Sequence, residues 1–251
     1  MPKLVIVRLE PEDNSIRNWG CINCWKFVAV FALAILLLPV GCGGLYYYAH
    51  KYSDFKNDQE FQVILHSSLM PLGLISINGM SILSYRICRC MFRMNIKILH
   101  AALHTATLGI IGFGLYEVWE YHSSKSIEHL VSLHSQIGAL TVGLFCAQYL
   151  MGLMSFIGLL ACENVTDTAR ADFIPIHAAV GRMIFLLAIA SCITGISQKI
   201  FTLDAKTRDD KLSLASTCAG AVIALGIVSM YILTTERLRY KAHILSNTSE
   251  E

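Results

Sequence analysis

The chain has 251 residues, of which 55% are hydrophobic and only 15% are charged. A soluble domain usually has about 25% charged residues, so the composition excludes an ordinary soluble protein and indicates a membrane protein surrounded by lipid. The formal net charge of +2 gives no reason to expect a nucleic-acid partner.

Six stretches are long enough to cross a hydrocarbon core, which takes about 20 apolar residues in a helix. In chain order they are residues 27–49, 61–85, 98–116, 130–162, 173–198 and 212–235. A single charged residue, Arg182, interrupts the fifth stretch. Because the stretches are too long for strands and lack polar alternation, the sequence predicts an all-α fold, a six-span transmembrane helix bundle. We expect residues 1–251 to form a single membrane domain.

Lysine and arginine residues in the short loops predict the orientation, because cytoplasmic loops carry an excess of them. The loop between the second and third spans has four basic residues and no acidic one: Arg86, Arg89, Arg93 and Lys97. The loop after the fifth span is also basic, but its charges are partly balanced by aspartates. The segment 117–128 is acidic and is expected to be an outer loop. With six spans, both termini are then expected in the cytoplasm.

Five histidines lie inside the uncharged stretches, where ionisable residues are costly and indicate a functional site. They are His66, His100, His104, His134 and His177. His66 and His134 lie close to the starts of spans two and four, which both begin at the outer face. His100 and His177 lie close to the starts of spans three and five, which begin at the cytoplasm. Depth in the membrane therefore predicts two histidine pairs, one near each face.

Two facing imidazoles from different helices can supply both axial ligands of a haem b iron. The sequence therefore predicts two haem b groups, with His66 and His134 between spans two and four, and His100 and His177 between spans three and five. An iron with both axial positions filled transfers electrons and has no position left for a substrate. His104 lies one turn after His100 on nearly the same face. We favour His100 as the ligand and His104 as a packing neighbour, but the sequence leaves this choice open.

The alternative function is a transporter or channel that uses intramembrane histidines as a proton or metal relay. Such a relay needs acidic or polar partners within the spans. The sequence offers Asn78, Gln148 and a few hydroxyl groups there, and no Asp or Glu. The transporter interpretation therefore has fewer residues in its favour than the haem interpretation.

Small residues and prolines in the spans have structural interpretations. Small residues allow close helix packing in membranes, and proline bends a helix. We expect a bend at Pro71. We expect close packing at Gly109, Gly112, Gly114, Gly138 and Gly143.

Four short motifs accompany the paired histidines: SYR at 84–86, KILH at 97–100, SLHS at 132–135 and PIH at 175–177. The paired histidines follow one another at separations of 34, 34 and 43 residues. In these motifs, their order and their spacing, the chain resembles the cytochrome b561 family over about residues 61–198. The resemblance implies a six-span, ascorbate-dependent electron carrier in the plasma membrane or in an endosomal, lysosomal or secretory-vesicle membrane. It also implies that the chain can form a homodimer.

The resemblance implies an oxidoreductase that passes electrons from cytoplasmic ascorbate through two non-covalent haem b groups to monodehydroascorbate or ferric iron. Arg93, Lys97 and Arg170 match family positions that contact ascorbate, a monoanion that basic side chains can bind by charge-assisted hydrogen bonds. The alternative is that these charges only mark the cytoplasmic side. Arg86 matches the family's Tyr-Arg motif near the cofactor. For Arg182, pairing with a haem propionate and snorkelling to the interface are both open.

On the outer side, Tyr121 and His122 resemble the family's aromatic-His pair at a second substrate site. A histidine there can exchange a proton with monodehydroascorbate or help to hold iron, and the alternative is a solvated loop histidine. The chain departs from the family at two nearby positions. Val131 stands where the family commonly has Tyr, which removes a possible hydrogen bond, and Gln136 stands where it commonly has Trp.

Overall fold

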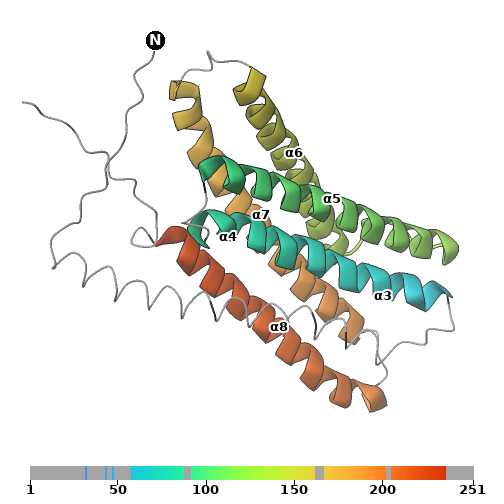
Figure 1. Cartoon of the computed structure of the whole chain (residues 1–251). Helices are drawn as coiled ribbons and strands as arrows, with labels where there is room; N and C mark the ends of the chain where they lie inside the picture. The colour runs from blue at the N-terminus through green and yellow to red at the C-terminus, as the bar shows by residue number, and fades with distance from the viewer. Residues whose placement is uncertain are drawn as a thin grey trace, which may run out of the picture.

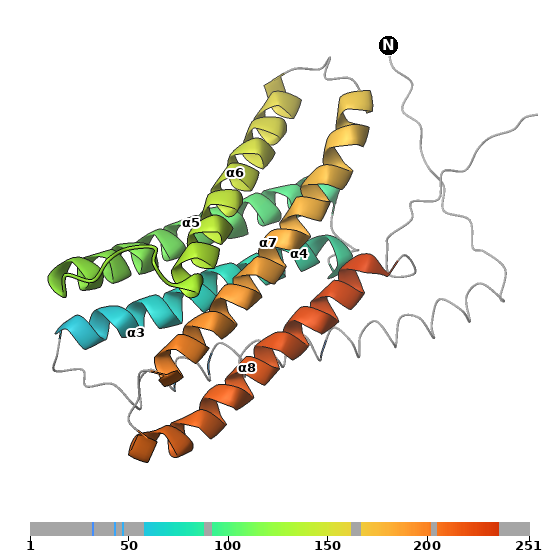
Figure 2. The same ribbon diagram turned by 180° about the vertical axis from the view of Figure 1, so that it is seen from behind.

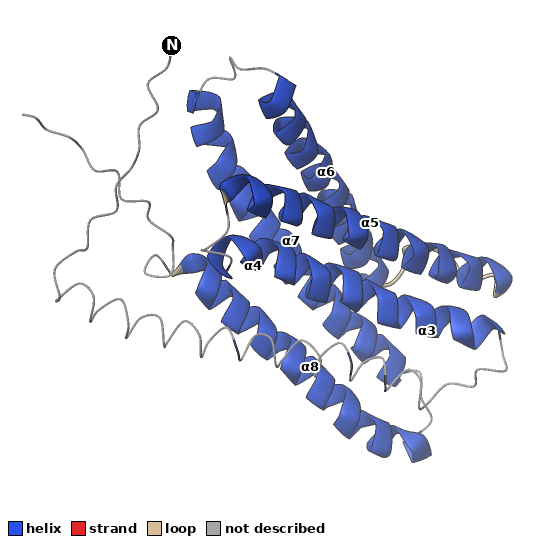
Figure 3. Cartoon of the chain, viewed as in Figure 1, coloured by secondary structure: helices blue, strands red, loops and turns tan. Residues whose placement is uncertain are grey.

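The structure is a computed structural model that describes residues 58–87, 92–161, 167–201 and 205–235, together with the single positions 32, 43 and 47. Within these ranges the regular elements are helices, and no strand occurs (Figure 3). Five helical stretches are long and apolar enough to cross a membrane: Gln59–Arg86, Met94–Ser124, Leu133–Gly158, Asp172–Ile200 and Leu212–Thr234. They confirm five of the predicted spans. The predicted span at 27–49 and both predicted cytoplasmic termini lie outside the continuous described ranges.

The first described span consists of α3 (Asp58–Pro71), the π-helical segment η2 (Leu72–Ile77) and α4 (Asn78–Ile87). A proline inside a helix cannot donate a backbone hydrogen bond, and here the helix widens directly after Pro71. The wider turn ends at Asn78, whose backbone N–H donates to the Gly73 carbonyl. The buried Asn78 side chain donates to the Leu74 carbonyl over 3.0 Å. Asn78 therefore has a structural role in satisfying a backbone carbonyl.

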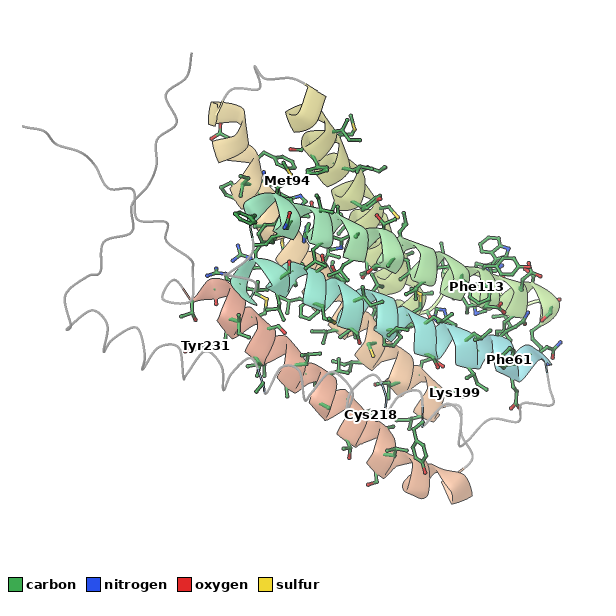
Figure 4. The ribbon with its side chains drawn as sticks, in the orientation of Figure 1. Phe61, Met94, Phe113, Lys199, Cys218 and Tyr231 are labelled. Atoms are coloured by element: carbon green, nitrogen blue, oxygen red, sulfur yellow. The ribbon has the colours of Figure 1, made fainter. Side chains whose placement is uncertain are left out.

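Four long helices follow: α5 (Arg93–Ser124), α6 (Leu133–Ala161), α7 (Asp167–Phe201) and α8 (Ala205–Thr234). Helices α3 and α5 lie side by side and run in opposite directions (Figure 1). Phe61 near the start of α3 and Met94 near the start of α5 are accordingly at opposite ends of the bundle (Figure 4). Helix α6 packs along α7, and α8 packs along the other side of α7 (Figure 2). The arrangement is two helix pairs, α3/α5 and α6/α7, with α8 packed against α7 and α4.

The apolar core joins η2, α4, α5, α6, α7 and α8. Its largest fully buried side chain is Phe185 on α7, which packs in one cluster with Ile75, Ile111, Val222 and Leu225. On the outside of the bundle, large apolar side chains such as Phe113 and Tyr231 are half exposed and point away from the helices (Figure 4). Lipid is the solvent that suits such a surface.

The predicted glycine contacts are confirmed at two of the five positions. A Cβ atom at Gly114 would lie 3.2 Å from the Met70 sulfur, and one at Gly138 would lie 3.3 Å from the Ser191 hydroxyl oxygen. No atom of the described residues lies within 4 Å of such a Cβ at Gly109, Gly112 or Gly143, so the prediction of close packing against them is wrong within this part of the chain.

The predicted outer loop at 117–128 is partly wrong, because α5 continues to Ser124. Charged residues end the stretch that can face lipid, but they do not end a helix. The helix therefore projects about two turns beyond the predicted span. Tyr121 and His122 consequently lie on a helix rather than in a loop.

Candidate functional site

The four predicted ligand histidines come from four different helices, and the structure brings them together in two pairs. His66 on α3 faces His134 on α6, with ring centres 6.1 Å apart and planes at 84°. His100 on α5 faces His177 on α7, with ring centres 6.3 Å apart and planes at 66°. Each pair joins one helix of α3/α5 to one helix of α6/α7. These are the pairs that depth in the membrane predicted.

The separation within each pair fits a single metal ion between the two rings. An imidazole nitrogen binds a metal at about 2.0 Å and lies about 1.1 Å from the centre of its own ring, so two rings on opposite sides of one metal have centres about 6 Å apart. The separations of 6.1 and 6.3 Å agree with this value. The donor set of each pair therefore fits a haem iron held by two axial imidazoles.

Hydrogen bonds to backbone carbonyls fix the orientation of three of these rings. Nδ1 of His66 lies 3.0 Å from the Gly114 carbonyl oxygen, and Nδ1 of His134 lies 2.9 Å from that of Ser191. Nδ1 of His100 lies 3.1 Å from the Ser81 carbonyl oxygen. Because a carbonyl oxygen only accepts, Nδ1 carries the proton in each ring, and Nε2 keeps its lone pair for a metal. Outer-shell bonds of this kind are typical of metal-binding histidines.

The two pairs lie far apart along the helices. His100 is 14 residues before Gly114, the partner of His66, which corresponds to about 21 Å along α5. On α7, His177 is 18 residues before Gly195, which touches His134, or about 27 Å. This separation allows one pair in each leaflet of a bilayer with a hydrocarbon core about 30 Å thick.

Two glycines outside the predicted set make room for rings of the paired histidines. A Cβ atom at Gly195 would lie 2.8 Å from Cε1 and 3.0 Å from Nδ1 of His134. A Cβ atom at Gly152 would lie 3.0 Å from Cε1 of His177. All three separations are shorter than ordinary van der Waals contacts, so the rings rest directly on the helix backbone at these points.

Substitution of Gly195 by alanine is expected to displace the His134 ring and to weaken haem binding at the His66/His134 pair. The added methyl group would overlap both the ring carbon and the nitrogen that bonds Ser191, and overpacking of this kind costs about 1–3 kcal/mol. Haem content per chain after purification measures the effect. Gly220→Ala is the matched control, because no described atom lies within 4 Å of a Cβ there. Equal haem content in both variants would contradict the prediction.

His104 lies beside the second pair but has different surroundings from His100. Its ring centre is 4.3 Å from that of His100 and 5.6 Å from that of Phe145. Its Nδ1 is buried and has no hydrogen-bond partner among the described residues. Nδ1 of His100 has hydrogen-bond partners on Ser81, whereas Nδ1 of His104 has none in this part of the chain. The geometry therefore favours His100 as the ligand.

The family comparisons agree with this geometry. The sequence model of eukaryotic cytochrome b561 matches residues 65–202. The chain is 33% identical over 180 residues to a transmembrane ascorbate-dependent reductase of Sus scrofa, covering 70% of both proteins. It is 32% identical over 218 residues to a lysosomal membrane ascorbate-dependent ferrireductase of Bos taurus, covering 83% of this chain and 81% of the relative.

The chain belongs to the eukaryotic cytochrome b561 family. Its described residues include five helices long and apolar enough to cross a membrane, and it is an integral multi-pass membrane protein and an oxidoreductase. All four paired histidines lie within the residues that the family model matches. The match also includes all the cationic and aromatic residues that the sequence analysis placed at substrate or cofactor sites.

The predicted cationic residues are distributed around the start of α5 and on α4 and α7 of this cytochrome b561. Lys97 is exposed, one turn before His100. Arg93 begins α5 and Arg170 lies in the first turns of α7, but their side chains lie outside the described part of the structure. Arg182 is half-buried on α7, five residues after His177 and therefore on a different face of that helix. Both interpretations of Arg182 stay open.

Arg86 has a role in the fold that the sequence did not indicate. Its guanidinium donates to the carbonyl oxygens of Leu233 at 2.5 Å and Thr235 at 3.4 Å, at the end of α8. The last carbonyls of a helix have no partner within the helix, and a cation there is favourable. Arg86 therefore joins the end of α4 to the end of α8. A contact with the cofactor stays a prediction for this residue.

At the other end of α5, aromatic rings form a continuous stack. The Trp119 and His129 rings are 4.0 Å apart and nearly parallel, and His129 stacks on His122 at 5.2 Å. Tyr121 lies 5.9 Å from His122, edge to face. Nδ1 of His122 is buried without a hydrogen-bond partner in the described residues. Tyr121 and His122 were predicted from the sequence but His129 was not, because the path of the following turn was not predictable.

The turn that carries His129 contains two residues with left-handed backbone, Ser126 at φ 54° and Leu130 at φ 61°. Such a conformation is uncommon for residues other than glycine, so it needs support from its surroundings. The Gln136 side chain donates to the Leu130 carbonyl over 3.3 Å. Gln136, one of the two departures from the family pattern, thus contacts the turn that leads into α6. Val131, the other departure, is exposed.

Proposed function

We propose that the protein transfers electrons from cytoplasmic ascorbate, through two haem b groups, to monodehydroascorbate or ferric iron on the opposite side of the membrane. The observation that carries the proposal is that four helices bring four histidines together in two pairs, with ring centres 6.1 Å apart in one pair and 6.3 Å apart in the other. The named activities of the relatives, ascorbate-dependent reductase and ferrireductase, support the choice of donor and acceptor. Each haem b, when bound, supplies one-electron redox chemistry.

In this proposal, the residues of the chain bind the cofactors and the substrates and orient them. His66 and His134 hold the outer haem, and His100 and His177 hold the cytoplasmic haem, each through Nε2. The carbonyls of Gly114 and Ser191 keep the outer rings in place. Two imidazoles would hold each haem, so the chain would bind the electron donor and the electron acceptor beside the cofactor.

The donor site is proposed at the start of α5. Lys97 is exposed one turn before His100, so its ammonium group can bind the ascorbate anion close to the cytoplasmic haem. Arg93 lies one further turn away, and Arg170 is two turns before His177 on α7. The three cations together attract and orient the donor. Arg86 and Arg182 remain proposed contacts of the cofactor.

The acceptor site is proposed at the opposite end of α5, around Tyr121 and His122. His122 can hold or exchange a proton, or bind a metal ion, at its imidazole. His129 stacks on this ring and is added to the site as a support for it. Trp119 continues the stack to the exposed surface.

The complete chain is proposed to be one membrane domain of six spans with cytoplasmic termini. In this orientation Lys97 faces the cytoplasm, and Tyr121 and His122 face the lumen of an organelle or the cell exterior. A homodimer is compatible with the proposal, because each chain supplies all four histidines of its two pairs.

Vesicles that contain the purified protein and trapped ascorbate test the function. We expect two haem b groups per chain by pyridine haemochrome assay, reduction of most of this haem by ascorbate, and release of ferrous iron from an external ferric chelate. Vesicles without ascorbate are the control. A protein that stays colourless after expression with added haem would contradict the proposal and favour the proton or metal relay.

A further inference from the structure

Ser81 on α4 makes a set of contacts to His100 that has no equivalent, within the described residues, at the other three paired histidines. The residue is fully buried. Its hydroxyl oxygen lies 3.0 Å from Nδ1 of His100 and donates to the His100 carbonyl oxygen over 3.1 Å. Its own carbonyl oxygen lies 3.1 Å from the same Nδ1. A single residue therefore contacts both the ring and the backbone of His100.

The directions of these hydrogen bonds follow from the chemistry of the groups. The Ser81 carbonyl can only accept, so Nδ1 of His100 carries a proton. The hydroxyl proton of Ser81 is directed to the His100 carbonyl, which leaves the hydroxyl oxygen free to accept from Nδ1–H. Nδ1–H thus has two acceptors on one residue. The neighbouring Ser84 donates to the Ser81 carbonyl over 2.7 Å and orders the same segment.

The other paired histidines have weaker support at Nδ1 in the described structure. His66 and His134 each have one backbone carbonyl. Nδ1 of His177 is buried and has no partner among the described residues. Of these four rings, His100 is the one whose Nδ1 contacts a side-chain oxygen of the described residues. Substitution of Ser81 can remove this oxygen while the backbone acceptor stays.

We propose that Ser81 is a positioning residue that lowers the reduction potential of the haem held by His100. The inference rests on the proposed function. Each acceptor at Nδ1–H makes the imidazole more electron-rich at Nε2, and a stronger donor ligand favours ferric over ferrous iron. The ring keeps its proton, and one electron enters the cofactor on reduction, so no bond is made or broken. The two haems then differ in potential partly through one serine.

Because His104 lies close to His100, the orientation of the His100 ring also has to be controlled. Its ring centre is only 4.3 Å from that of His100, and it is a second imidazole that could compete for the same iron. By holding both the ring and the carbonyl of His100, Ser81 keeps Nε2 of that residue directed away from α4. A change in potential caused by ligand exchange can be distinguished by removing His104.

Redox titration of the purified holoprotein, followed by absorption spectroscopy, tests the inference. Wild type is measured first, and the proposed function requires two haem groups, each with a one-electron transition. In Ser81→Ala we expect the transition of the haem on His100 and His177 to move to higher potential, with about a fivefold change in the ferrous-to-ferric ratio. The transition of the other haem should not move. Ser81→Cys nearly keeps the side-chain volume but hydrogen-bonds weakly, so the potential should move in the same direction in this variant. It replaces the alanine variant if that variant does not keep both haems.

Two controls test whether the lost Ser81 contact causes the change in potential. Ser229→Ala removes a buried hydroxyl on α8 that has no partner in the described residues and should leave both potentials unchanged. The Ser81→Ala shift should persist in a His104→Phe background, because His100 remains the ligand. An unchanged potential, a shift shared equally by both haems, or a shift that disappears without His104 would overturn the inference. Failure of wild type to bind two haems would overturn the proposed function instead.

Discussion

Replacing His66 or His134 by alanine is expected to leave a protein with one haem b in place of two. Each substitution removes one of the two imidazoles whose centres are 6.1 Å apart. The other pair, about 21–27 Å away along the helices, shares no residue with it. His100→Ala and His177→Ala should cause the reciprocal loss. Haem per chain and the two redox transitions measure which haem remains.

His129→Ala is the matched control for these variants. Its imidazole is exposed and stacks on Trp119 and His122, but it belongs to neither pair, so both haems should be kept. Because removing one ligand of a buried metal site can destabilise a whole helix bundle, thermal unfolding of each variant is measured alongside. Equal loss of both haems from each single variant, with normal unfolding temperatures, would contradict the separation into two pairs.

The pairing of these histidines was predictable because it depends on quantities that a sequence carries. The absence of charge defines where each span begins, and 1.5 Å per residue converts distance from that start into depth. His66 and His134 therefore matched in depth before any contact was known. The structure agrees because the helices alternate in direction, as short connections between spans require.

The groups that orient the rings were not predictable in the same way. His66 and His134 donate to backbone carbonyls of Gly114 and Ser191, and every residue has a carbonyl. Gly195 lies against the His134 ring, whereas no described atom lies within 4 Å of a Cβ at Gly143, although both are glycines within spans. The two glycines differ because each helix is rotated about its axis to a particular angle. Apolar spans are only weakly amphipathic, so the sequence does not reveal this rotation.

Local departures from regular helix geometry were also not predictable from the sequence. Pro71 predicted a bend, and what the structure has directly after it is the wide turn at η2, where Asn78 donates to the carbonyls of Gly73 and Leu74. This turn sets the rotation of α4 relative to α3 and hence the position of Ser81 against His100. The stack of His129 on His122 likewise depends on two left-handed residues, Ser126 and Leu130, that are not glycines.

Lys97→Ala is expected to slow reduction of the haem by ascorbate by about tenfold or more, while reduction by dithionite stays unchanged. Lys97 is exposed one turn before His100, and a lost hydrogen bond between charged groups costs about 1.5–3 kcal/mol. Dithionite is a small reductant that does not depend on a shaped anion site, so it reports the intact haem. Stopped-flow absorption with each reductant measures both rates, and Arg93→Ala should behave in the same way.

Lys199→Ala is the matched control, because Lys199 lies near the end of α7 and at the end of the bundle away from Met94 (Figure 4). If Lys97 acted only as a general cytoplasmic charge, Lys97→Arg would restore the ascorbate rate fully and high salt would abolish the difference from wild type. A bound anion instead requires a specific geometry that arginine does not reproduce. An unchanged ascorbate rate in Lys97→Ala would remove this residue from the donor site, and the positive charges around it would then serve membrane orientation alone.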